Sequence, residues 1–139
     1  MNPVLFLLMR TDLDSMNPGK ACAQAAHAAN ALEHHYLNLL EHTEANDDLV
    51  IAYDKWQKQT PQGFGTTIVL GGEMDNIRVD IDHLADTGFL AGVVHDPTYP
   101  LVDGSVTHLI ALDTCAYVFA PDKDDYKLRL VLNKYKLHP

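Results

Sequence analysis

Apolar residues fall in short continuous runs and in stretches of helical spacing, and this alternation predicts strands and helices in turn. Val4 to Met9 is a continuous apolar run, which is typical of a strand buried on both faces. Thr66 to Leu70 and Leu90 to His95 are two further predicted strands, bounded by glycines or turn residues. Two later apolar runs, residues 106–112 and 115–119, contain at least one more strand.

Four segments between these strands have the pattern of helices. Lys20 to about His42 is predicted as one long helix that begins in a run of alanines, with Ser15 or Asn17 as its cap. The other three predicted helices span residues 46–59, 74–85 and 122–134. We expect a loop from Asp96 to Ser105, and Leu137 along a sheet edge.

This order of elements predicts the fold class. Alternating strands and helices favour a single-domain, three-layer α/β sandwich over residues 1–139, with a mixed, mostly parallel sheet of four to five strands. Ligands of such sheets bind outside the carboxyl ends of the strands. The segments expected to converge there are Arg10–Asp12, the helix start at Gly19–Lys20, and His95–Tyr99.

One face of the long predicted helix carries candidate chemistry. Lys20, Gln24 and His27 are spaced i, i+4 and i+7, so a cation, an amide and an imidazole share one face among alanines. Lys20 at a helix start can attract an anion such as phosphate, and His27 can act as a base or an orienting donor. The alternatives are an exposed first-turn lysine and a histidine hydrogen-bonded at the helix–sheet boundary.

A second group of candidates surrounds the ends of two predicted strands. Asp96 follows an apolar strand, where it can orient a lysine or polarise a water, or else simply cap a turn. Thr98 and Tyr99 can contact a ligand or pack in the loop. Arg10 can meet a phosphate or pair with Asp12, and the sequence leaves these alternatives open.

Several classes of site and protein are disfavoured. The eight histidines lack metal-ligand spacing, so no metal site is expected. The phosphate-loop pattern GxxxxGK[ST] fails because Asp14 and Ala21 occupy two of its positions. Cys22 and Cys115 are expected as small buried side chains. The longest apolar run is far below the roughly 20 residues of a membrane span, so no membrane association and a cytoplasmic location are expected.

The charge is unevenly distributed along the chain. The formal net charge is −9, which by itself disfavours nonspecific nucleic-acid binding. Residues 123–139 nevertheless carry a net +3, against −12 for the remainder. This basic terminus is either a polyanion contact or a solvated helix face.

The N-terminal motif resembles that of type II peptidyl-tRNA hydrolases, whose pattern is roughly RTDL-x-MGKGK-x-x-AQ-x-x-HA. The matching residues are Arg10-Thr11-Asp12-Leu13, Met16, Gly19-Lys20, Ala23-Gln24 and His27-Ala28. The resemblance implies a compact α/β sandwich, often a homodimer. It also implies hydrolysis of the ester between a peptide and the 3′ end of tRNA, with peptidyl-tRNA as substrate and no metal or nucleotide cofactor.

The resemblance also assigns roles to particular residues. Lys20 and Asp96 become the catalytic pair, while Gln24 and His27 line the same cleft, and His27 or Thr98 completes the hydrogen-bond set. Arg10, Asp12, Gly19 and Tyr99 are the further expected substrate-binding residues.

The chain departs from the family pattern at several positions. Asn17 and Pro18 replace a glycine and a lysine of the family motif. Pro100 stands where direct alignment places a functional threonine, and Thr98 is the candidate to supply that hydroxyl. The loop before Thr114 is about six residues longer than in the family pattern. Two other functions therefore stay open: a non-catalytic module that binds tRNA, a nucleotide or a protein, and a hydrolase of a small acyl substrate.

Overall fold

The central strand β1 (Val4–Arg10) is enclosed on both faces, as its continuous apolar run predicts. The computed structural model describes all residues, 1–139. Every side chain from Val4 to Met9 is buried. Since successive side chains of a strand point to opposite faces, β1 contributes to two separate hydrophobic clusters. Leu5, Leu7 and Met9 lie in one, and Val4, Phe6 and Leu8 in the other.

The sheet has five strands in the order β3-β4-β1-β2-β5. Only β1 and β2 (Thr67–Gly72) pair in parallel, while β1–β4, β3–β4 and β2–β5 are antiparallel. The expectation of a mixed sheet is confirmed, but the expectation that it is mostly parallel is wrong. β1, β2 and β3 do run in the same direction. β4, however, lies between β3 and β1 and runs the opposite way, so the parallel strands are not all neighbours.

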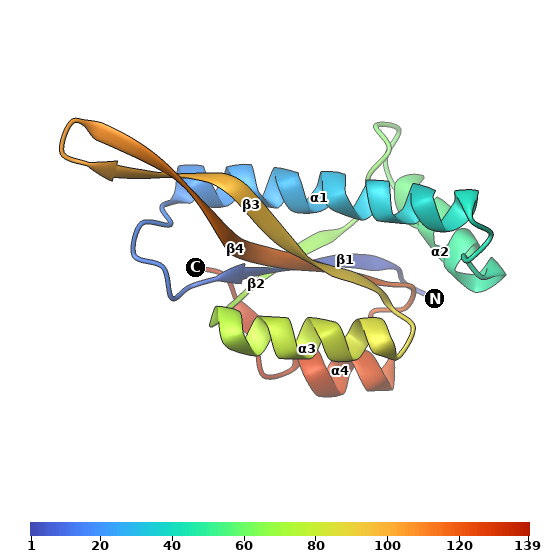
Figure 1. Cartoon of the computed structure of the whole chain (residues 1–139). Helices are drawn as coiled ribbons and strands as arrows, with labels where there is room; N and C mark the ends of the chain where they lie inside the picture. The colour runs from blue at the N-terminus through green and yellow to red at the C-terminus, as the bar shows by residue number, and fades with distance from the viewer.

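Helices cover both faces of this sheet, which confirms the three-layer sandwich. α1 (Pro18–Glu41) and α2 (Asp47–Gln57) lie over one face, and α3 (Met74–Asp86) and α4 (Tyr126–Leu132) over the other (Figure 1). α4 is shorter than expected because the side chain of Asp125 caps it. None of the four helices is both long and apolar enough to cross a bilayer.

α1 begins where the sequence indicates, and its start positions the candidate residues. The side-chain oxygen of Asn17 accepts a hydrogen bond from the backbone N–H of Lys20 at 2.9 Å, and Pro18 occupies the first turn. Asn17, rather than Ser15, is therefore the cap. The buried residues of the helix are Gln24, Ala28, Leu32 and Tyr36, which form one stripe facing the sheet.

The segment expected as a loop is instead part of a long hairpin. β3 (Leu90–Asp103) and β4 (Val106–Ala120) pair from Leu90 to Asp103, with register shifts between Val94 and His95 and between Asp96 and Tyr99. They turn at residues 104–105, where Gly104 has φ +60°. The proline-rich segment suits this strand because β3 is an edge strand, where Pro97 and Pro100 remove few ladder hydrogen bonds. The hairpin projects beyond the start of α1 (Figure 1).

The chain ends close to the opposite edge of the sheet. β5 (Lys136–Leu137) pairs antiparallel with β2, which confirms the expected position of Leu137. The backbone N–H of His138 also donates to the carbonyl of Val69 at 2.9 Å. This last segment therefore lies beside the carboxyl ends of the two parallel strands.

Truncating the buried face of α3 should destabilise the fold far more than truncating its exposed face. Ile77 is fully buried, whereas Val79 on the same helix is 69% exposed. Ile77→Ala should lower the free energy of unfolding by about 2–5 kcal/mol through lost burial and a residual cavity. Val79→Ala, the matched control, should change it by less than about 0.5 kcal/mol. Urea denaturation measures both, and equal losses would contradict the described packing.

Candidate active site

Asp96 is a buried carboxylate held by three hydrogen bonds. Its side chain is 8% exposed. The Oδ2 atom accepts a bond from Gln24 Nε2 at 2.7 Å. The Oδ1 atom accepts from the backbone N–H of Thr98 at 2.8 Å and from the Thr98 hydroxyl at 3.3 Å. The long hairpin thus supplies both the acid and the turn that fixes it.

These contacts keep Asp96 ionised. Burial acts to raise the pKa of the Asp96 carboxyl, but the hydrogen bonds from Gln24 and Thr98 and the nearby His27 ring outweigh it. The net effect is a pKa lowered from the ordinary value of 3.8. Asp96 therefore carries a negative charge at neutral pH.

Thr114 extends the polar contacts one residue deeper into the molecule. Because the ionised Asp96 can only accept, the amide nitrogen of Gln24 must face it, and the amide oxygen must face Thr114. The Thr114 hydroxyl, fully buried, donates to that oxygen at 2.6 Å. Thr114 therefore fixes the orientation of the Gln24 amide. The sequence signal for it is weak, because 90 residues separate it from Gln24.

His27 lies within reach of the carboxylate, whereas Lys20 does not pair with it. His27 Nε2 is 4.0 Å from Asp96 Oδ2, and the ring is about half exposed. Lys20 Nζ lies 5.1 Å from the centroid of the Tyr99 ring. None of the ion pairs of the molecule includes Lys20. Lys20, Gln24 and His27 lie on α1 as expected. The Lys20 ammonium group, however, lies over the Tyr99 ring and forms no ion pair with Asp96.

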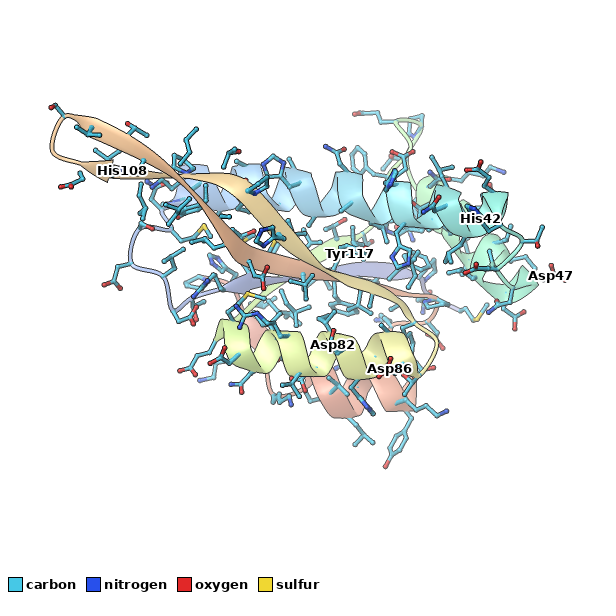
Figure 2. The ribbon with its side chains drawn as sticks, in the orientation of Figure 1. His42, Asp47, Asp82, Asp86, His108 and Tyr117 are labelled. Carbon is cyan, nitrogen blue, oxygen red and sulfur yellow. The ribbon has the colours of Figure 1, made fainter.

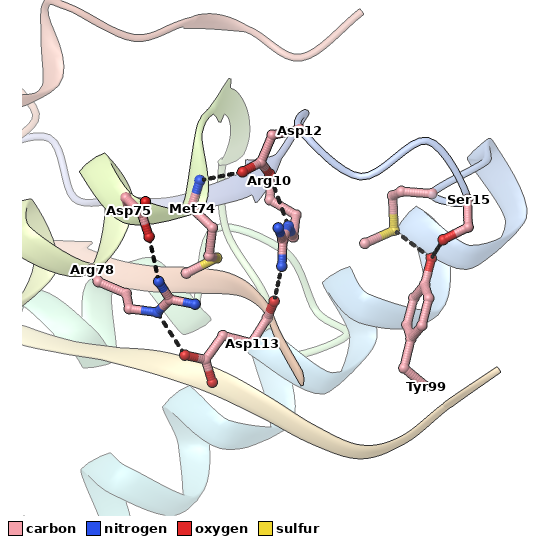
Figure 3. Close-up of polar contacts among 9 residues, drawn as sticks. Arg10, Asp12, Ser15, Met74, Asp75, Arg78, Tyr99 and Asp113 are labelled. Carbon is pink, nitrogen blue, oxygen red and sulfur yellow. Dashed lines mark hydrogen bonds and ion pairs between the residues drawn. The ribbon is translucent and has the colours of Figure 1, made fainter. Parts of the chain in front are cut away.

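Tyr99 joins the first loop to the hairpin. It is fully buried, and its hydroxyl lies 3.1 Å from the Ser15 hydroxyl and 3.9 Å from the sulfur of Met16 (Figure 3). Packing therefore accounts for Tyr99, and the cation–ring contact makes it a support for Lys20. Ser15, expected only as a helix cap, has this different role.

Arg10 and Asp12 belong to a separate cluster near the start of α3 (Figure 3). Arg10 Nε donates to Asp12 Oδ1 at 2.8 Å, and its Nη1 donates to the backbone carbonyl of Asp113 at 2.9 Å. Asp12 also accepts from the backbone N–H of Met74 at 3.3 Å. Of the two alternatives for Arg10, pairing with Asp12 is the one observed. The structure therefore does not bring these two residues into the Asp96 site.

Asp113 ties the same cluster together. Arg78 Nε donates to its Oδ2 at 2.7 Å, and His95 Nδ1 lies 2.9 Å from its Oδ1. The Arg78 hydrogen bond is the main reason that the pKa of Asp113 is lowered. Each cation here already has a carboxylate partner, so the cluster mainly fastens α3 to the sheet.

The other residues considered from the sequence are Gly19, the two cysteines and the histidines. Gly19 lies exposed in the first turn of α1, and a Cβ there would meet only the Asn17 side chain, at 3.5 Å, so packing does not require glycine. Cys115 is buried as expected, but Cys22 is exposed, contrary to expectation. The histidines are scattered, with His42 and His108 at opposite ends of the view in Figure 2.

A sizeable cavity lies outside this site. It has a volume of about 500 Å³ and lies at the carboxyl end of β1, against the first turns of α1. Arg10 is its only lining residue among the expected site residues. Asp96, by contrast, stands on the hairpin side of α1, with Gln24 and His27.

The groups around Asp96 can promote hydrolysis, the cleavage of a polar bond by water. An ionised acid, an imidazole and an unpaired lysine lie around the start of one helix. These groups can orient a water, move a proton and offset a developing negative charge.

Comparison with known proteins matches most of the chain to one family. The family model described as Peptidyl-tRNA hydrolase PTH2 matches residues 4–98, about two-thirds of the chain. The match extends from β1 to the Asp96–Thr98 turn, and Thr114 lies beyond it. No curated protein matches the chain.

Removing the amide of Gln24 should raise the pKa of Asp96. In Gln24→Leu the strongest bond that lowers this pKa is lost, while the burial that raises it remains. Carboxyl ¹³C shifts followed through a pH titration measure the change. Ser15→Ala, which alters the loop contact to Tyr99 but not the carboxylate, is the control. An unchanged Asp96 pKa in Gln24→Leu would contradict the hydrogen-bond assignment.

The same substitution should weaken the acid dependence of stability. Because its folded pKa is lowered, Asp96 stabilises the protein above its ordinary pKa of 3.8, and this contribution is lost as pH falls through the folded value. Urea denaturation at pH 7 and at pH 3 should therefore show a smaller difference in Gln24→Leu than in wild type. An identical difference would contradict the prediction.

Proposed function

The chain belongs to the peptidyl-tRNA hydrolase PTH2 family, and from that premise we propose that it hydrolyses the ester between a peptide and the 3′ end of tRNA. The observation that carries the proposal is the buried, ionised Asp96, held by Gln24 and Thr98 inside the matched span. In the reaction, the oxygen of a water bonds to the ester carbonyl carbon. The bond from that carbon to the ribose oxygen breaks, giving a peptide carboxylic acid and a tRNA 3′ hydroxyl.

The attacking water is proposed to lie between Asp96 and His27. Their facing atoms are 4.0 Å apart, too far for a direct hydrogen bond but a distance that one water bridges. A carboxylate whose pKa is lowered is a weak base at neutral pH, so its role is to orient the water. Imidazole readily gains and loses a proton near neutral pH. His27 is therefore the proposed acceptor of the water proton.

Lys20 is proposed to stabilise the negative charge of the reaction. As the tetrahedral intermediate forms, the carbonyl oxygen gains charge, and a nearby ammonium group lowers the energy of that state. Lys20 is suited to this role because no carboxylate neutralises it and the Tyr99 ring supports it. The positive end of the α1 helix dipole adds to the same field and can also attract a phosphate.

Thr98 is proposed to act through Asp96. Its backbone N–H and its hydroxyl both contact Oδ1 of the carboxylate, while Oδ2, which accepts from Gln24, is the oxygen that faces His27. Pro100, at the position of the family threonine, has no hydroxyl to contribute. The proposed machinery is therefore Lys20, His27 and Asp96, with Gln24 and Thr98 as positioning residues.

One observation favours a smaller substrate as the second candidate. The net charge is −9, and the arginines nearest the site, Arg10 and Arg78, are both paired with carboxylates. A small acyl ester would need no basic surface for its binding. A non-catalytic binding module would use the same helix start without turnover.

Substitution of the two charged groups should remove most of the activity. Lys20→Ala and Asp96→Asn should each lower kcat for N-acetyl-aminoacyl-tRNA by roughly 10²–10³-fold, the usual cost of losing such an electrostatic contact. Lys58→Ala, which removes an exposed lysine paired with Asp54, is the matched control and should retain wild-type activity. A loss below about tenfold in Lys20→Ala would contradict its role.

Salt dependence separates the candidate substrates. Contacts with tRNA phosphates should make KM rise steeply between 50 and 200 mM salt, because binding releases counterions. A small neutral acyl ester should show little change over the same range. Tight tRNA binding by folded wild type without any ester cleavage would instead support the binding module.

A further inference from the structure

The outer part of the β3–β4 hairpin, here called the ribbon (Tyr99–Leu112), has only two strands. β1 pairs with β4 from Cys115 to Ala120 and no further. Between Val106 and Leu112, every paired residue of β4 has its partner in β3, and no backbone hydrogen bond joins this stretch to another segment. The ribbon projects beyond the start of α1 (Figure 1). Each of its strands therefore directs a row of unpaired N–H and C=O groups outward.

The two edges of the ribbon differ in how they resist pairing with a further strand. The β3 edge contains Pro100, which has no N–H to donate, and the acidic Asp103 near the turn. Prolines and charges are usual means by which proteins keep a free edge unpaired. The β4 edge reads Val-Thr-His-Leu-Ile-Ala-Leu over residues 106–112, without proline, glycine, acid, lysine or arginine. Only the β4 edge is therefore open to another strand.

Exposed apolar side chains accompany this open edge. Leu109, in the middle of the β4 stretch, is 63% exposed, and Val102 on β3 is 68% exposed. Leu109 lies opposite Pro100, and Thr107 lies opposite Val102, so these four residues share one face of the ribbon. None of the four carries a charge. A strand added beside β4 would cover Thr107 and Leu109 from the side.

A second copy of the same strand fits this edge in both geometry and charge. A strand pairs with its own copy in antiparallel fashion about a two-fold axis, so donors meet acceptors without a mismatch. The net charge of −9 keeps copies apart over most of the surface, but Asp103 is the only acidic residue of the ribbon. Because Asp103 lies on β3, three strand spacings separate the two copies of it, about 14 Å. That separation exceeds the screening length of about 8 Å at physiological salt.

We propose that Val106–Leu112 is the interface of a homodimer in which two β4 strands pair antiparallel about an axis at Leu109. The two Leu109 side chains then pack on each other, and Thr107 of each copy faces Ala111 of the other. Both outer edges of the resulting four-stranded sheet are β3 strands, which carry Pro97 and Pro100, so association stops at two copies. The interface lies beyond residue 98, where the family match ends.

Paired variants of opposite charge pattern test both the dimer and its register. Light scattering should give wild type at high micromolar concentration a mass about twice the 15.4 kDa of one chain. Thr107→Lys combined with Ala111→Lys places lysines opposite each other across the axis and should give the monomer mass. Thr107→Lys combined with Ala111→Glu, the matched control, places a lysine opposite a glutamate and should stay dimeric. Both positions are exposed, so neither change disturbs the core.

Each other outcome of this experiment overturns the proposal. A monomeric wild type excludes the dimer. Equal masses for the two double variants exclude the stated register. Assemblies that continue to grow with concentration contradict closure at two copies.

Hydrogen exchange locates the interface without any substitution. In concentrated wild type, the amides of Val106–Leu112 that point away from β3 should exchange several-fold more slowly than in dilute protein. The outward amides of the β3 edge, from Tyr99 to Asp103, are the internal control and should exchange equally fast at both concentrations. Protection that does not change with concentration on the β4 edge, or that appears on the β3 edge instead, would contradict the assignment.

The dimer and the proposed hydrolysis stand or fall separately. Lys20, His27 and Asp96 all lie outside the interface segment, and neither measurement of association involves turnover. A monomeric wild type that cleaves peptidyl-tRNA would contradict the dimer alone. A dimer of the stated register that cleaves no ester would contradict the proposed function alone.

Discussion

Burial of β1 on both faces is the constraint on which the rest of the structure depends. A strand without a polar face must be covered from two sides, and this places α1 and α2 over one face and α3 and α4 over the other. It also requires a hydrogen-bonded strand along each edge, supplied by β2 and β4. The polar residues after β1 therefore emerge at the end of a fully buried strand, between two helical layers.

The Asp96 site holds an ionised carboxylate in a buried position, where burial by itself disfavours the charged form. Asp96 comes from β3, Gln24 from α1 and Thr114 from β4, so three elements must pack correctly before the carboxylate is satisfied. The hydrogen bonds favour the ionised form more than burial opposes it. A proposed hydrolytic role for this acid is thus coupled to the packing of α1 on the sheet.

The hairpin and the first loop together shape the surroundings of the site. Tyr99 is buried between them, in contact with Ser15 and Met16 and beneath Lys20. The loop therefore has two sides: one contacts Tyr99 beneath Lys20, and the other lines the cavity at the carboxyl end of β1.

The sequence by itself determined the local structure, and the tertiary structure decided which side chains meet. The buried strand, the cap at Asn17 and the shared face of Gln24 and His27 follow from propensity and periodicity, which act over a few residues. The antiparallel insertion of β4 and the contact of Thr114 with Gln24 do not, since they join segments 90 or more residues apart. Arg10 likewise lies on an expected strand end, but long-range packing, and not its position in the chain, pairs it away from Asp96.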